Sequence, residues 1–191
     1  MPPSSIKSSF ENPQTFIVIW QPMSLTPISR QIEHNSAKII KIISGGQTGV
    51  DRASLDAAIE VGIMHGGFCP KGRRSEDGII PSKYIMSEME TDDYLERTLK
   101  NVQFSDGTLI LHKGEIIAGT RQTEKICFLE KKPMLTINIL DECKEIRVNF
   151  NKWLEKNTIS ILNIVGPRES EAHIYKQVKK ILIDLLSKHF L

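Results

Sequence analysis

A short apolar run followed by glycines and a helical pattern limits the possible folds of this chain more than any other feature. The β-branched run Ile39–Ile43 predicts a strand, and it leads into Ser44-Gly45-Gly46-Gln47-Thr48-Gly49-Val50-Asp51. Apolar residues then recur at helical spacing, at Ala53, Leu55, Ala58 and Ile59. A strand that feeds a helix through a glycine turn is typical of a parallel sheet covered by helices.

The same alternation of strands and helices continues to the C-terminus. A helix is expected after an N-cap at Thr91, with Asp92 and Asp93 in its first turn. The later elements are a strand near Thr108–Leu111, a helix over about Thr120–Glu130, a strand at Met134–Ile139, a helix near Lys144–Lys156, a strand at Ile159–Val165 and a final helix with an apolar stripe from Ile174 to Leu186. We therefore predict an α/β fold: a Rossmann-like parallel sheet with helices on both faces, in a single domain over residues 38–191.

Two segments lack this pattern. Residues 1–37 are rich in Pro, Ser and Gln and show no sustained period, so we predict an N-terminal tail that is disordered or loosely packed. Residues 63–90 are irregular and are predicted to be a long loop with at most one short strand. Loops of this length are often functional.

Charge and cysteine content exclude several classes of function. The formal net charge is +2 and the charges are interspersed, which does not favour a nucleic-acid or membrane-surface partner. The three cysteines, at positions 69, 127 and 143, form no CxxC pair, and no apolar run has the roughly 20 residues of a membrane helix. We expect a cytoplasmic protein. His65 and Cys69 have no second ligand pair at matching spacing, so no metal site is expected.

The glycine turn suits an anion. Backbone N–H groups and the positive end of a helix dipole meet where a strand enters a helix through glycines. The segment Gly45–Gly49 is not a Walker loop, because no Lys-Ser or Lys-Thr pair follows it. It is a poor dinucleotide fingerprint as well, since Ser44 stands at the position of the first glycine. The alternative is a tight turn without a ligand.

Two further segments follow strands and should reach the same edge of the sheet, where open α/β folds bind ligands. They are Gly119-Thr120-Arg121-Gln122-Thr123, with two hydroxyls, and Gly166-Pro167-Arg168-Glu169-Ser170. Pro167 suits a first helical position, and Arg168 could bind an oxyanion with two hydrogen bonds. Taken singly, each segment could be only a helix cap.

The long loop contributes the basic segment Lys71-Gly72-Arg73-Arg74, which either meets further anionic groups of a ligand or is a solvated patch. Glu76 and Asp77 could balance these charges or act as acid and base. The residues expected to contact the ligand are Gly45, Gly46, Gln47, Thr48, Gly49, Asp51, Arg52, Lys71, Arg73, Arg74, Gly119, Thr120, Thr123, Gly166, Arg168 and Ser170. No catalytic residue can be assigned from the spacing.

The order of these segments, together with Ser105-Asp106-Gly107-Thr108, resembles the putative molybdenum carrier family from about Ile39 to the C-terminus. Members of that family resemble a circularly permuted branch of the Rossmann-like superfamily that includes the so-called lysine decarboxylases and the cytokinin-activating phosphoribohydrolases. The resemblance implies binding of molybdenum cofactor (molybdopterin) or of a nucleotide. In the hydrolases a glycine-threonine pair is followed, after two residues, by a catalytic glutamate. Thr123 holds that position here, and Glu124 is displaced by about 100° around the helix.

The sequence therefore favours binding or carriage of a small anionic, nucleotide-like ligand, with molybdenum cofactor as one candidate. Two alternatives stay open. One is an N-glycosidic hydrolase acting on nucleoside monophosphates, with Glu76, Asp77 or Glu124 as acid or base. The other is a nucleotide-sensing module that acts through protein partners. Turnover and a homo-oligomeric state are both left open.

Overall fold

The structure is a computed structural model that describes residues 38–188. The predicted tail, residues 1–37, lies outside the described residues. Within the described part, the α/β fold with a parallel sheet confirms the sequence-based prediction.

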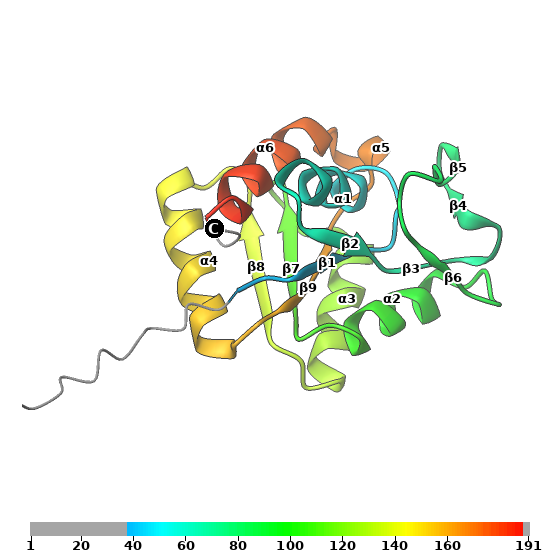
Figure 1. The fold of residues 1–191 in the computed structure, drawn as a ribbon, viewed down its shortest axis with the longest axis horizontal. Helices are drawn as coiled ribbons and strands as arrows, with labels where there is room; N and C mark the ends of the chain where they lie inside the picture. The colour runs from blue at the N-terminus through cyan, green and yellow to red at the C-terminus, as the bar shows by residue number, and fades with distance from the viewer. Residues whose placement is uncertain (1–37, 189–191) are drawn as a thin grey trace, which may run out of the picture. The chain divides into compact units, whose positions relative to one another are not determined.

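Five parallel strands form the main sheet, in the order β2-β1-β9-β7-β8 (Figure 1). Their bounds are β1 Lys41–Ile43, β2 Met64–Gly66, β7 Gly107–His112, β8 Met134–Asn138 and β9 Ile161–Val165. The chain moves outward from β1 to β2, resumes at β7 and moves outward to β8, and then returns to place β9 between β1 and β7. The strand order thus reverses at the centre of the sheet, and ligands of open α/β folds bind at such a switch point.

Six α-helices cover this sheet among the described residues. Their bounds are α1 Val50–Val61, α2 Tyr94–Gln103, α3 Ala118–Leu129, α4 Cys143–Asn157, α5 Glu169–Ala172 and α6 Tyr175–Leu186. Helices α1, α4 and α6 share one large apolar cluster with the strands, in which Phe150, Leu109 and Val178 are completely buried. Helices α2 and α3 pack together through Val102 and Ile126 on the other side of the sheet (Figure 1).

The long segment 63–90 contains more structure than the sequence predicts. Its first residues form β2, which is an edge strand of the main sheet. Strand β3 (Phe68–Cys69) pairs with β6 (Ser87–Glu88), and β4 (Arg74–Ser75) forms a hairpin with β5 (Gly78–Ile79), just after the 3-10 turn η1 (Lys71–Arg73). Strands of two or three residues are too short to show a period of two, so the prediction of a mostly irregular loop was wrong.

Two helix starts also differ from the prediction. Asp93, not Thr91, is the N-cap of α2: its Oδ1 accepts a hydrogen bond from the Leu95 amide at 2.7 Å. The expected final helix is two helices, α5 and α6, separated at His173, whose φ of 47° is left-handed. Arg168 is the N-cap of α5, so Pro167 lies before the helix rather than at its first position.

Candidate functional site

Three predicted segments meet at one cavity of about 190 Å³, here called the first cavity. It lies where the loops after β1, β7 and β9 leave the sheet, next to α2. Seven predicted site residues line it: Gln47, Asp51, Gly119, Thr120, Thr123, Gly166 and Arg168. The convergence inferred from the order of strands therefore exists in the structure, because parallel strands direct their carboxyl ends to one edge.

Gln47 lines the first cavity and carries a side-chain donor without a partner. Its Oε1 accepts hydrogen bonds from the backbone amides of Thr48 (3.0 Å) and Glu76 (2.8 Å). These two donors fix the orientation of the side-chain amide, so that Nε2 is left without a protein partner. The hairpin that carries Glu76 thus sets which end of the Gln47 amide can meet a ligand.

A buried ion pair packs against the glycine loop. Asp51 Oδ2 lies 3.4 Å from Arg97 Nη1, and the two side chains are 5% and 10% exposed. Burial raises the pKa of Asp51, while the Arg97 charge and the Gln47 amide oppose that rise. Gly45 makes room for this pair, because a Cβ at that position would lie 1.5 Å from Arg97 Nη1.

Unpartnered polar atoms concentrate at the first cavity. Among the described residues, five buried side-chain nitrogen or oxygen atoms have no hydrogen-bond partner, and three belong to residues that line it: Gln47 Nε2, Arg97 Nε and Thr120 Oγ1. Helix α3 also begins at this cavity without a side-chain cap on its N-terminus. Two of the three atoms can only donate hydrogen bonds, which makes the cavity suited to a ligand rich in acceptors.

Two guanidinium groups flank one tyrosine ring beside the cavity. Arg168 lies 5.5 Å and Arg97 5.7 Å from the centre of the Tyr94 ring. Cation–π contacts of this kind hold an arginine in place while leaving its N–H groups able to bind an anion.

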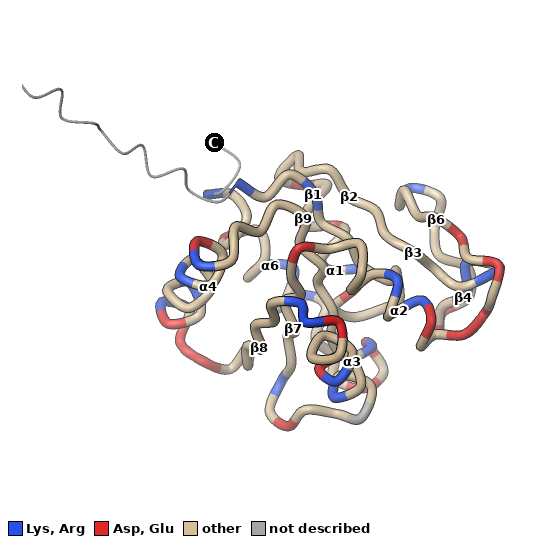
Figure 2. Tube along the Cα trace, turned by 90° about the horizontal axis from the view of Figure 1, so that it is seen from below, with Lys and Arg blue, Asp and Glu red and all other residues tan. Residues whose placement is uncertain are grey.

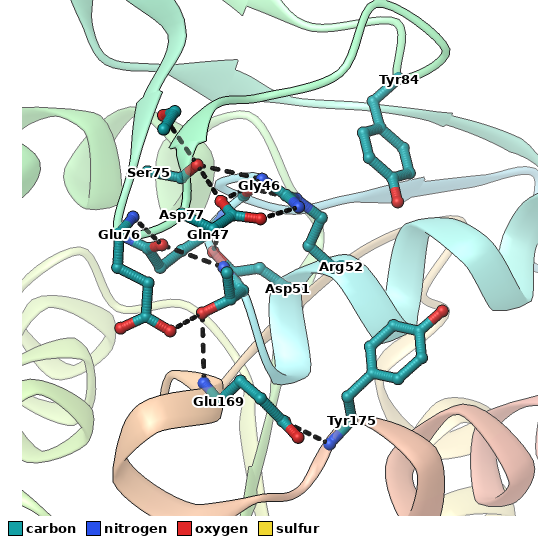
Figure 3. Close-up of polar contacts among 12 residues, drawn as sticks. Gly46, Gln47, Asp51, Arg52, Ser75, Glu76, Asp77, Tyr84, Glu169 and Tyr175 are labelled. Atoms are coloured by element: carbon teal, nitrogen blue, oxygen red, sulfur yellow. Dashed lines mark hydrogen bonds and ion pairs between the residues drawn. The ribbon is translucent and has the colours of Figure 1, made fainter.

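The β4–β5 hairpin is attached to the glycine loop on the opposite side (Figure 3). The Glu76 carboxylate accepts hydrogen bonds from the hydroxyl of Thr48 and from Ser170. Burial works against it, but these hydrogen bonds keep the pKa of Glu76 below its usual value. Arg52 forms a two-point ion pair with Asp77, at 2.8 and 2.9 Å, and also binds the Gly46 carbonyl.

The comparisons place this chain in a family. A model of the circularly permutated YpsA SLOG family matches residues 42–186. The chain belongs to this family. The crystal structure of a protein described as a putative molybdenum carrier from Syntrophus aciditrophicus SB is 43% identical, with a TM-score of 0.75, and the match covers 78% of this chain and 96% of that one. No curated protein matched the chain. The resemblance inferred from the sequence is thereby confirmed.

The remaining predicted residues of this SLOG protein lie elsewhere. Thr48, Gly49, Arg52 and Ser170 line a second cavity on the other side of the glycine loop. Gly45 and Gly46 line neither cavity, and the missing Cβ of Gly46 faces the side chain of Ile80 rather than open space. Gly46 has a φ of 75°, which explains the glycine without close approach of a ligand.

The basic segment of the SLOG protein is not at the first cavity. Arg73 donates hydrogen bonds to the carbonyl groups of Ile80, Pro81 and Tyr84, and so holds the loop that follows β5. Arg74 forms an exposed ion pair with Asp92. Lys71 lines neither cavity.

Glu124 does not face the first cavity either. Its Oε1 lies 3.3 Å from the hydroxyl of Thr136, and it lines an exposed groove beside Phe128. Thr123, by contrast, is 5% exposed and lines the first cavity. The displacement of about 100° expected between neighbouring helix positions is therefore what separates them.

Sequence reasoning missed Arg97. Arg97 lies in α2, and from the sequence an arginine in a helix is expected to be on its solvent-exposed face. The available signal was its spacing: Arg97 and Asn101 are four residues apart, and both are buried polar residues on one face of α2.

The described residues contain neither a membrane-spanning helix nor a cluster of metal-binding side chains. None of the helices in residues 38–188 is long and apolar enough to cross a membrane. In the same part of the chain, no three His, Cys, Asp or Glu side chains are placed to hold a metal ion.

Proposed function

We propose that this SLOG protein binds a small anionic, nucleotide-like ligand and holds its phosphate, or an equivalent oxyanion, in the first cavity. The observation that carries the proposal is the group of three buried, unpartnered atoms: Gln47 Nε2, Arg97 Nε and Thr120 Oγ1. A buried polar atom without a partner destabilises a fold by about 1–3 kcal/mol. Oxygen atoms of a bound anion that reach these atoms would remove this cost.

Charge and size support the same ligand. Two cations, Arg97 and Arg168, and two carboxylates, Asp51 and Glu171, line the cavity. Asp51 is paired with Arg97, so Arg168 is the cation placed to bind an oxyanion. The volume of about 190 Å³ is below the roughly 300–1,000 Å³ of sites that enclose a whole drug-sized ligand. The cavity therefore suits the anionic end of a ligand whose remainder lies outside it.

Molybdenum cofactor is the cargo that we propose first, because the similar solved protein is described as a putative molybdenum carrier protein. The donors of the first cavity fit the phosphate of that cofactor. They offer no thiolate for the metal: Cys69 and Cys127 are buried away from the cavity, and Cys143 is exposed. We propose that the protein holds the cofactor through its phosphate. The unpaired cysteines also support a cytoplasmic location.

Hydrolysis is less well supported than binding. The carboxylates considered for acid and base roles, Glu76, Asp77 and Glu124, do not line the first cavity. The carboxylates that do line it are Asp51, which is engaged by Arg97, and Glu171. Incubation of the protein with nucleoside monophosphates checks this directly, because a hydrolase would release free base. A sensing module would bind without turnover, as a carrier would.

Replacement of Arg168 by alanine is expected to weaken the binding of inorganic phosphate and of nucleoside monophosphates at least about tenfold. The reason is that a charge-assisted hydrogen bond contributes about 1.5–3 kcal/mol. Calorimetric titration at low and high salt measures the effect, and the salt dependence should decrease with the lost charge.

Arg74→Ala is the matched control, because it removes an exposed arginine that lines neither cavity. It should bind phosphate as the wild type does. If Arg74→Ala loses affinity while a folded Arg168→Ala does not, the anion binds at the basic segment 71–74 and the first cavity is not the site. Mass spectrometry of ligand extracted from fresh protein identifies the cargo independently.

A further inference from the structure

The second cavity lies beside the first, on the other side of the glycine loop, and has a volume of about 540 Å³. Thr48, which follows Gln47 in the loop, and Ser170, two residues after Arg168, both line it. Glu76, which contacts both Thr48 and Ser170, also lines the second cavity. The second cavity is therefore separate from the proposed phosphate site but is built on the same two segments.

Two tyrosines from different parts of the chain line it, and Tyr175 is the one whose ring is partly exposed (Figure 3). Tyr175 begins α6, whereas Tyr84, which follows β5, is 3% exposed and packs in a core cluster. Both donate their hydroxyl hydrogen to the same oxygen, Asp56 Oδ2, at 2.9 and 2.7 Å. Lys83 Nζ binds the other oxygen of Asp56 at 2.7 Å. Asp56 thus ties the Tyr175 ring to the buried Tyr84, so the Tyr175 ring is ordered before any ligand arrives.

The tyrosines keep their protons at neutral pH. Burial and the hydrogen bond to Asp56 raise the pKa of Tyr175 well above its usual value. Burial also raises the pKa of Tyr84. Neutral phenol rings offer a flat, polarisable face, which favours stacking of another ring.

The second cavity has more carboxylates than lysine and arginine side chains. The carboxylates of Asp56, Glu76, Asp77 and Glu169 line it, against the cations Arg52 and Lys176. Arg52 is 12% exposed in its side chain and is bound to Gly46, Ser75 and Asp77. The excess of negative charge favours a ligand that donates hydrogen bonds over a second phosphate.

We propose that the second cavity binds a flat heteroaromatic ring with an amino group, as in a nucleobase or a pterin, against Tyr175. The ring stacks on Tyr175, and its N–H groups face the carboxylates. One part of this assignment rests on the proposed function: that the ring and the anion belong to the same ligand. Ring binding itself can be measured without any phosphate.

Titration with adenosine, guanosine and pterin, none of which carries a phosphate, tests the site by upfield shifts of the ring protons in NMR spectra and by calorimetry. Comparison of the affinities for adenosine and guanosine with the affinity for pterin shows whether the site prefers a nucleobase or a pterin. Tyr175→Leu should weaken binding about 5- to 150-fold, the range measured for loss of one base–aromatic stack. Tyr175→Phe retains the ring and should retain most of the affinity.

Phe128→Leu is the matched control, since it removes an aromatic ring that is 81% exposed and lies outside the second cavity. It should leave binding unchanged. Thermal melts monitored by circular dichroism establish that each variant is folded. The proposal is overturned if none of the three compounds binds the wild type at millimolar concentration, or if a folded Tyr175→Leu binds them normally. Binding of nucleosides that depends on Tyr175, without any binding of phosphate, would retain the ring site and refute the proposed function.

Discussion

Replacement of Gly49 by alanine should lower the free energy of unfolding by about 3–5 kcal/mol, a large part of the 5–15 kcal/mol typical of a domain. Gly49 combines φ 71° with ψ −125°, a conformation that residues with a Cβ adopt only at a cost of about 1–3 kcal/mol. A Cβ there would also lie 2.4 Å from the Pro167 carbonyl oxygen and 2.7 Å from the Glu169 nitrogen. These are backbone atoms, so the loops after β1 and β9 would have to separate.

Gly114→Ala distinguishes the two contributions. Gly114 has the same φ of 71°, but no atom lies within 4 Å of its ideal Cβ position. Its replacement should cost only the conformational strain, about 1–2 kcal/mol. Thermal and urea unfolding of both variants measures the difference. Equal losses would mean that the contact between Gly49 and the Pro167 loop does not constrain the fold.

The main elements of this fold could be predicted because each has a strong local signal. The run Ile39–Ile43 and the glycines after it mark a strand and a helix start, and the stripe from Ile174 to Leu186 marks a buried helix face. The short strands between residues 63 and 90 have no such signal. Strand β2 pairs with β1 and β3 pairs with β6, and pairing between separated segments is not encoded in a local period. Strands β4 and β5 form a hairpin, but two residues each are too few to show a period.

The position of the candidate site could be predicted from the sequence, but not all of its residues could. Its position follows from topology, because loops after neighbouring parallel strands must meet. Which individual residues line the cavity depends on side-chain contacts, and these cannot be predicted from the spacing of residues in the sequence. Arg168 lines the first cavity, whereas Arg73, on a more basic loop, is bound to backbone carbonyls. Ser170 was expected beside Arg168 but contacts Glu76 from the hairpin.

Replacement of Arg97 by methionine should destabilise the protein by about 3–5 kcal/mol at neutral pH, the usual cost of leaving one member of a buried ion pair without its partner. Asp51 is 3% exposed, and Arg97 is the cation that its carboxylate contacts, at 3.4 Å. Methionine retains much of the side-chain volume, so the loss would come from the charge rather than from a cavity. Urea unfolding of the variant and of the wild type measures it.

The loss should depend on pH. Burial raises the pKa of Asp51 in the folded protein, so the native state binds this proton more tightly than the unfolded chain does. Such a group favours the native state most below its unfolded pKa, and the contribution is lost as pH rises through the folded pKa. Without Arg97 the folded pKa rises further. The deficit of Arg97→Met should therefore be small near about pH 4, close to the unfolded pKa of about 3.9, and largest near about pH 8.

The double variant Asp51→Asn/Arg97→Met separates the stability role of Arg97 from its role in binding. Replacement of both members of a buried ion pair by neutral groups is often close to neutral in stability, so at about pH 8 the double variant should be more stable than Arg97→Met alone. A deficit that is the same at both pH values, with no recovery in the double variant, would show that the Asp51 charge is not what Arg97 neutralises. The recovered protein should still bind phosphate more weakly than the wild type, because the donor at Arg97 Nε is gone. Normal phosphate binding by the stable double variant would limit Arg97 to supporting the glycine loop and leave Gln47, Thr120 and Arg168 as the anion-binding groups of the first cavity.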